Sequence, residues 1–162
     1  MTTLDRCLEL LDRAGVWYSH TGHPLAFTAV EVAAAESLLP HKLAKTIIYG
    51  GAQGYGMAVL PADCLIDIEL LRGFLKDHTV RIATEREVGE LFPECDLGAM
   101  PPFGNMFHMP VVVDSTVAEQ EFIAFNAGTH RDVIHINYND FARLVKPRVA
   151  KFSFAAAEQA MA

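Results

Sequence analysis

Two apolar runs joined by a short glycine-flanked turn constrain the fold of this chain most strongly. The runs cover residues 45–50 and 55–60, and the four residues between them, 51–54, have the composition of a hairpin turn. Each run is apolar at successive positions, so both faces of each extended strand would be apolar. We therefore expect a β-hairpin that lies in the middle of a sheet.

Capping motifs and apolar periodicity predict the elements around this hairpin. Helices are expected over residues 4–14, 28–39, 66–76, 84–92 and 139–145. Short strands are expected over residues 16–21, 80–83, 111–114, 121–126 and 133–137, the last two linked by a turn around Gly128. Helices mixed irregularly among hairpin-connected strands indicate one domain over residues 1–162, of α/β (mixed α+β) class, built around one sheet, with a frayed tail from about residue 155.

Composition and charge exclude several classes of protein. The longest uncharged run, residues 97–113, holds three prolines and two glycines, so it is not expected to span a membrane. Asp5, Glu9 and Asp12 interrupt the N-terminus where an export signal would need an apolar core, so a cytoplasmic protein is expected. The net charge of −7 argues against general coating of nucleic acid. Three cysteines with no CxxC pair argue against a disulfide framework or a thiolate zinc site.

The loop over residues 97–105 has the least ordinary composition. Gly98 and Gly104 enclose the adjacent prolines Pro101 and Pro102. Such a stiff loop can aim consecutive backbone N–H groups at an anionic or carbonyl oxygen, as an oxyanion hole does. A tight structural turn would have the same composition, so both interpretations stay open.

Lys45 is unusual because it begins a strand that is otherwise apolar. An edge lysine commonly prevents aggregation, and that interpretation holds if the strand is peripheral. If the hairpin is central, the ammonium of Lys45, beside Thr46, must point into a cleft and bind an anion or a carbonyl group.

His130 lies in the turn between the last two predicted strands, where a surface histidine is the ordinary interpretation. His20 and His23 are spaced like weak metal ligands, but the chain contains no HExxH, so no metal site is expected. The signatures of serine hydrolases, P-loop NTPases and Rossmann dehydrogenases, which are GxSxG, Walker A and GxGxxG, are also missing.

Taken in order, four segments resemble the YbaK/ProX superfamily, which comprises aminoacyl-tRNA deacylases related to the insertion editing domain of bacterial prolyl-tRNA synthetase. These segments are residues 23–28, 44–48, 98–104 and 127–130, and the resemblance extends over about residues 4–144. The family's motif residues fall on Lys45, on Gly98, Pro102, Phe103 and Gly104 of its GxxxPFG loop, and on Gly128 and His130. The resemblance implies a curved, mostly antiparallel mixed sheet flanked by helices, with no metal and no cofactor.

The resemblance also implies an activity, the hydrolysis of the ester that joins a wrong amino acid to tRNA. Backbone donors of residues 98–104 would receive the negative charge of the transition state. Lys45, with Thr46 and Gly128 among the substrate-binding residues, would hold the terminal adenosine phosphate or the substrate carbonyl. His130 would line the pocket, and no protein nucleophile or metal would be needed.

Pocket size would then select the amino acid. Phe27, Met100, Phe103 and Met106 are bulky residues expected near the pocket, which favours alanine on a proline tRNA and resembles the ProXp-ala branch. The expected partners are the acceptor end of a mischarged tRNA, through the basic region 131–151, and a prolyl-tRNA synthetase. A non-catalytic tRNA- or synthetase-binding module on the same fold and a histidine-based metallohydrolase remain as alternatives.

Overall fold

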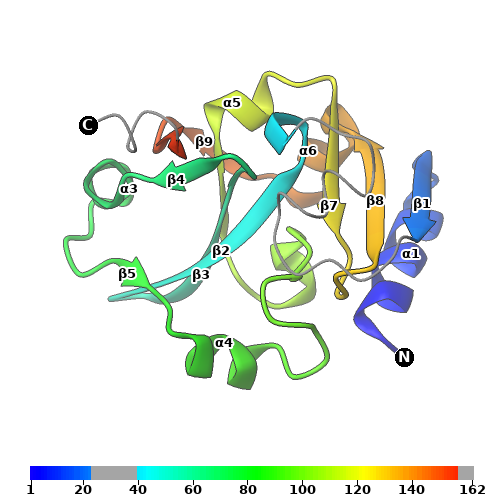
Figure 1. Cartoon of the computed structure of the whole chain (residues 1–162), viewed down its shortest axis with the longest axis horizontal. Helices are drawn as coiled ribbons and strands as arrows, with labels where there is room; N and C mark the ends of the chain where they lie inside the picture. The colour runs from blue at the N-terminus through cyan, green and yellow to red at the C-terminus, as the bar shows by residue number, and fades with distance from the viewer. Residues whose placement is uncertain (23–39, 157–162) are drawn as a thin grey trace.

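The structure of the chain is a computed structural model that describes residues 1–22 and 40–156. The helix expected over residues 28–39 and the candidate pocket residue Phe27 lie outside the described residues. Figure 1 shows a long hairpin crossing the middle of the molecule, with further strands and helices on both sides of it.

The N-terminal helix α1 (Thr3–Ala14) begins and ends as the sequence predicts. The hydroxyl of Thr2 accepts the N–H of Asp5 at 3.0 Å, and the carboxylate of Asp5 accepts the N–H of Thr2 at 3.0 Å. Gly15 ends the helix with φ 66°, in the left-handed region that glycine adopts without strain. This reciprocal capping confirms the predicted helix.

The predicted hairpin is formed by β2 (Ala44–Gly51) and β3 (Gly54–Pro61), and it is internal to a five-stranded sheet of order β5-β2-β3-β6-β9. The other strands are β5 (Arg81–Ile82), β6 (Val111–Asp114) and β9 (Arg148–Ala150). Strand β5 pairs only with Tyr49 and Gly50, so among the described strands its ladder along that edge of β2 stops before Lys45. The central position of the hairpin is confirmed, and Lys45 lies beyond the end of the β5 pairing.

The remaining strands form two further sheets, where the sequence predicted one sheet. Strands β1 (Tyr18–Gly22), β8 (Asp132–Asn137) and β7 (Phe122–Asn126) pair antiparallel, as do β4 (Cys64–Ile66) and β10 (Ser153–Ala155). Between β2 and β7 a single bridge, Leu43 to Ala124, replaces a continuous ladder. This bridge lies one residue before β2, which begins at Ala44.

In the described residues, four more helices flank these sheets (Figure 1). They are α3 (Ile68–Leu75), α4 (Glu85–Leu91), α5 (Ser115–Ala118) and α6 (Tyr138–Val145), with 3-10 turns η1 (Pro40–Lys42) and η2 (Gly104–Met106). The α+β class with mixed sheets flanked by helices is confirmed. None of the helices in the described residues has the length and apolar character needed to cross a membrane.

The core has two parts, one on each face of the five-stranded sheet. Met57 and Val59 of β3 pack into one part, and Ala58 and Leu60 pack into the other. This alternation explains why the hairpin runs are apolar at successive positions beyond Lys45 and Thr46. A strand apolar on both faces must be internal, and that fixes the position of Lys45 at its open end.

Candidate functional site

A cavity of about 240 Å³ lies at the Lys45 end of the hairpin. Its lining joins β2 to the loop around Gly98 and the end of β7, and comprises Leu43, Ala44, Lys45, Thr46, Ile47, Gly98, Asn126 and His130. Four residues that the sequence analysis singled out, Lys45, Thr46, Gly98 and His130, therefore meet in one place. They are separated by up to 85 positions in the chain and come from three different segments.

Lys45 supplies the positive charge of this cavity. Its side chain is half-buried, and burial lowers the pKa of the ammonium below its ordinary value, an effect that the nearby Cys64 and Asp63 groups partly offset. A partly desolvated ammonium interacts more strongly with an anion or a polarised carbonyl than one in bulk water. Lys45 is therefore not the solvated edge lysine that the sequence left open as an alternative interpretation.

The loop that carries Gly98 is fastened to the turn that carries His130. The N–H of Asp96 donates to the carbonyl of Gly128 at 2.8 Å, and the N–H of Gly128 donates to the carbonyl of Ala99 at 2.8 Å. The N–H of His130 donates to a carboxylate oxygen of Asp96 at 3.0 Å. These three bonds make the two loops one rigid unit, so Gly128 acts here through the backbone.

His130 holds the backbone of this unit in place. Its side chain is buried, and its Nε2 lies 2.6 Å from the carbonyl oxygen of Leu97, so Nε2 carries the proton and donates. The next residue, Gly98, has φ +85°, and a Cβ there would lie 3.7 Å from Cε1 of His130. His130 thus fixes the backbone of Gly98 at the cavity wall.

The second half of the predicted GxxxPFG loop serves packing. Pro102 is buried, and the ring of Phe103 is fully buried, with its centroid 5.3 Å from that of Phe125 and 5.9 Å from that of Phe141. A Cβ on Gly104 would overlap the carbonyl of Met109. The structure does not bring Pro102, Phe103 or Gly104 to the described lining of the Lys45 cavity.

Replacing Gly104 by alanine is expected to destabilise the fold. The new methyl group would meet backbone that cannot rotate away, so we expect the free energy of unfolding to fall by about 3 kcal/mol in urea denaturation. Gly73, in the exposed middle of α3 with open space around it, is the matched control. Gly73→Ala should leave stability unchanged or raise it, and equal losses in both variants would contradict this account.

Met100 and Met106, two of the bulky residues expected to narrow the pocket, lie elsewhere. Met100 is buried and lines a separate cavity of about 80 Å³, against Val88 and Phe92 of the α4 region. Met106 lies beside α1, where its carbonyl accepts a hydrogen bond from Arg6 at 2.9 Å. The prediction that Met100 faces the site differs from the structure because the Met100 side chain packs toward the core.

Asn126, at the end of β7, is a cavity residue that sequence reasoning missed. Its Oδ1 atom is buried and accepts no hydrogen bond from the residues that the structure describes. An unsatisfied buried amide oxygen costs about 1–3 kcal/mol, which a bound donor would recover. The available signal was a polar residue that ends an apolar strand just before the His130 turn.

A larger cavity of about 450 Å³ lies at the opposite end of the hairpin. Its lining includes the hairpin turn, residues 75–80 and Arg148. It contains none of the site residues predicted from the sequence, so size alone does not make it the better candidate. The Lys45 cavity joins a desolvated cation, a rigid backbone turn and an unsatisfied acceptor.

Comparisons with known proteins identify the family of the chain. Residues 23–144 match the family of aminoacyl-tRNA editing domains. The chain is 31% identical over 113 residues to the proline–tRNA ligase of Kosmotoga olearia, covering 70% of this chain and 18% of the relative. It is 31% identical over 117 residues to the proline–tRNA ligase of Fervidobacterium nodosum, covering 72% and 20%. The chain thus spans about a fifth of the length of these relatives.

Solved structures share the fold. A crystal structure of a hypothetical protein matches with a TM-score of 0.83 at 20% identity, covering 92% of this chain and 99% of the other. A crystal structure of a proposed trans-editing enzyme for prolyl-tRNA synthetase matches with a TM-score of 0.80 at 20% identity, covering 94% and 98%. These likenesses confirm the expected architecture.

Proposed function

Because the chain belongs to the aminoacyl-tRNA editing domain family, we propose that it hydrolyses the ester bond of a tRNA that carries the wrong amino acid. The observation that carries the proposal is the convergence of Lys45, Gly98 and His130 on one small cavity. This arrangement supplies a cation and a fixed backbone turn where an ester carbonyl would lie.

Hydrolysis develops negative charge on the former carbonyl oxygen, and the cavity offers two groups that favour it. One is the ammonium of Lys45, which would bind this oxygen or the adjacent phosphate. The other is the N–H of Gly98, from which no hydrogen bond is seen to the described residues. His130 would act as a positioning residue because it holds the Leu97 carbonyl that precedes Gly98.

The nucleophile in this proposal is a water molecule, positioned in part by the substrate's own ribose hydroxyl. Lys45 and the Gly98 N–H would supply the charge stabilisation that a Lewis-acid metal provides in other hydrolases, so the reaction would be metal-independent. The described lining contains neither serine nor cysteine, and its one hydroxyl, on Thr46, belongs to a buried residue. Direct attack by water is therefore favoured over a covalent intermediate.

The proposed substrate carries a small amino acid, with alanyl-tRNA for proline as the best candidate. The volume of about 240 Å³ is below the range of about 300–1,000 Å³ common for drug-sized ligands, which suits a small acyl group. A synthetase pocket separates amino acids by only about 1–3 kcal/mol per methylene, so a second, smaller sieve is useful. The similarity to proline–tRNA ligases supports the choice of tRNA.

We further propose that the acceptor stem docks on the basic region 131–151, in the cytoplasm, and that a prolyl-tRNA synthetase can deliver it. The region carries five exposed bases, which are Arg131, Arg143, Lys146, Arg148 and Lys151. The net charge of −7 on the whole chain opposes binding of RNA, so affinity should be modest and should fall steeply with salt.

Asn126 is expected to recognise the α-ammonium group of the aminoacyl moiety. Replacing Asn126 by alanine should lower kcat/KM for alanyl-tRNA about tenfold, since it removes one charge-assisted hydrogen bond. The same variant should handle N-acetylalanyl-tRNA, which lacks the ammonium, as wild type does. Equal loss on both substrates, in single-turnover assays, would show that Asn126 has only a structural role.

The experiment that tests the proposal is a panel of misacylated tRNAs incubated with the purified chain and followed by release of the labelled amino acid. We expect turnover of alanyl-tRNA for proline, with a chelator present, and none of correctly charged prolyl-tRNA. Binding without turnover of any substrate would favour a non-catalytic tRNA-binding module. Turnover that the chelator abolishes would favour a metallohydrolase.

A further inference from the structure

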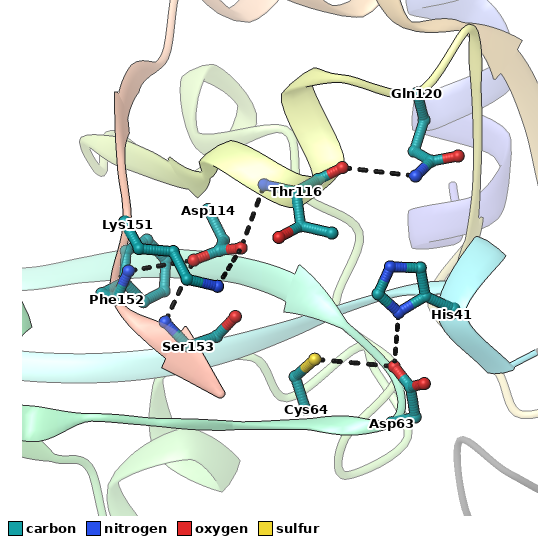
Figure 2. Close-up of polar contacts among 9 residues, drawn as sticks. All are labelled: His41, Asp63, Cys64, Asp114, Thr116, Gln120, Lys151, Phe152 and Ser153. Atoms are coloured by element: carbon teal, nitrogen blue, oxygen red, sulfur yellow. Dashed lines mark hydrogen bonds and ion pairs between the residues drawn. The ribbon is translucent and has the colours of Figure 1, made fainter. Parts of the chain in front are cut away.

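A second cluster of reactive side chains lies beside the hairpin, outside the Lys45 cavity. Figure 2 shows His41, Asp63 and Cys64 turned toward one another. Nδ1 of His41 lies 3.1 Å from Oδ1 of Asp63, and Sγ of Cys64 lies 3.6 Å from the same oxygen. The three atoms all lie within 4.8 Å of one another.

The hairpin itself brings these residues together. His41 belongs to η1, just before β2, and Asp63 and Cys64 follow β3. The N–H of Ala62 donates to the carbonyl of Leu43 at 2.8 Å, which fastens the two segments where the hairpin opens. The cluster is thus held by backbone contacts that do not depend on its own side chains.

We propose that His41, Asp63 and Cys64 form a binding site for a zinc ion. An imidazole nitrogen, a carboxylate oxygen and a thiolate sulfur are the ligand types that zinc uses, and nitrogen and sulfur select it over magnesium and calcium. With the thiol deprotonated, the three ligands carry a charge of −2, which a divalent ion neutralises.

In the present contacts, two donated protons lie where a metal ion would bind. The imidazole N–H and the thiol S–H both point to one oxygen of Asp63. A zinc ion would replace these two protons and bind the lone pairs of the nitrogen, the sulfur and the oxygen. The side chains of His41 and Asp63 are 44% and 40% exposed, which leaves a path for the ion and room for a water as fourth ligand. Cys64 is buried and closes the inner side.

Binding of zinc would clamp the open end of the hairpin, next to Lys45. The ion would bridge η1, which precedes β2, and the residues after β3, close to the Ala62 to Leu43 hydrogen bond that already joins these segments. The proposed ion takes no part in ester hydrolysis, and the proposal is independent of the proposed activity. Its effect would be on local stability, which can be measured directly.

The test is metal binding by wild type and by two ligand variants, Cys64→Ser and His41→Ala. Wild type should take up one equivalent of zinc in equilibrium dialysis. With cobalt(II) as the probe, it should show a thiolate-to-metal charge-transfer band that zinc removes. Each variant should bind zinc at least about tenfold more weakly, and Cys64→Ser should lose the band.

Two control variants keep the test specific. Nε2 of His20 lies 2.7 Å from Oδ1 of Asp132, in a histidine–carboxylate contact at the surface that includes no cysteine. Cys95 is a half-buried thiol outside the cluster. His20→Ala and Cys95→Ser should bind zinc as wild type does. The proposed site would be wrong if wild type bound less than one equivalent of zinc. It would also be wrong if the control variants lost as much zinc affinity as the ligand variants.

A second readout does not rely on the affinity itself. Zinc should slow hydrogen exchange of the Ala62 amide in wild type and leave it unchanged in Cys64→Ser. Unchanged exchange in wild type at saturating zinc would overturn the clamp. Neither measurement uses deacylation, so failure here leaves the proposed activity standing.

Discussion

Lys45→Ala is expected to lower kcat/KM for deacylation by about 10²–10³-fold while the chain stays folded. The ammonium of Lys45 is the one cationic side chain on the described lining of the cavity, and its half-buried position strengthens its interaction with a developing negative charge. Loss of that charge should reduce transition-state stabilisation more than substrate binding. Single-turnover kinetics on misacylated tRNA would therefore show a larger effect on kcat than on KM.

The matched control is Lys42→Ala, three residues earlier. Lys42 is exposed and its ammonium donates to Oε1 of Gln120 at 2.6 Å, away from the cavity. This variant should keep activity within about twofold, since an exposed contact of this kind contributes little. Lys45→Ala with wild-type turnover, or equal losses in the two lysine variants, would defeat the proposed role of Lys45.

Elements with strong local signals were predictable from the sequence. The capping box of Thr2 and Asp5, the stop at Gly15 and the two-faced apolar hairpin depend on neighbouring residues, and the structure has all of them. The short elements α5, β4, β9 and β10 were not anticipated, because three or four residues give too little periodicity. Their positions depend on contacts with distant segments.

The candidate site was predictable in part, and there is a physical reason why the rest of it was not. The resemblance indicated Lys45, Gly98 and His130, which the structure brings to one cavity. It could not separate residues that face the cavity from those that support the loop. Phe103 belongs to the motif but fills the core with its ring, and that distinction depends on side-chain direction.

The glycine-rich loop therefore combines two tasks in seven residues. Its first glycine, Gly98, holds a left-handed turn at the cavity wall, and its last, Gly104, permits close approach of the Met109 backbone. The packed end fixes the loop in the core, and bonds to the His130 turn fix the open end. Rigid support of this kind is what an oxyanion site requires, because donors must be in place before charge develops.

The buried carboxylate of Asp114 is expected to give the largest effect on stability. Asp114 ends β6 with no solvent exposure, and its oxygens accept the N–H groups of Phe152 at 2.9 Å, Ser153 at 3.0 Å and Thr116 at 3.1 Å (Figure 2). One side chain thus begins α5 and holds the segment that enters β10. Asp114→Asn removes the charge and replaces one of the two accepting oxygens by an NH₂ donor, which leaves at least one of these N–H groups unpaired, so the free energy of unfolding should fall by about 3–5 kcal/mol.

The pH dependence of this effect has a definite sign. Burial alone would raise the pKa of Asp114, but the hydrogen bonds to its carboxylate outweigh burial, and the pKa lies below its ordinary value. A lowered folded pKa means that the stabilisation is complete above the unfolded pKa of about 3.9 and is lost as the pH falls through the folded pKa. Urea denaturation should therefore give a large difference between wild type and Asp114→Asn at pH 7, and a shrinking one below about pH 4.

Asp140→Asn is the matched control for this prediction. Asp140 lies in the first turn of α6 and pairs with Arg143 at 3.1 Å, with 34% of its side chain exposed. A surface ion pair contributes about 0–1 kcal/mol, so this variant should unfold almost as wild type does at pH 7. If Asp114→Asn also stayed within about 1 kcal/mol of wild type, Asp114 would not be what fixes the C-terminal segment. The burial of Phe152 in the second part of the core, which also contains Leu60 and Tyr49, would then have to hold that segment in place.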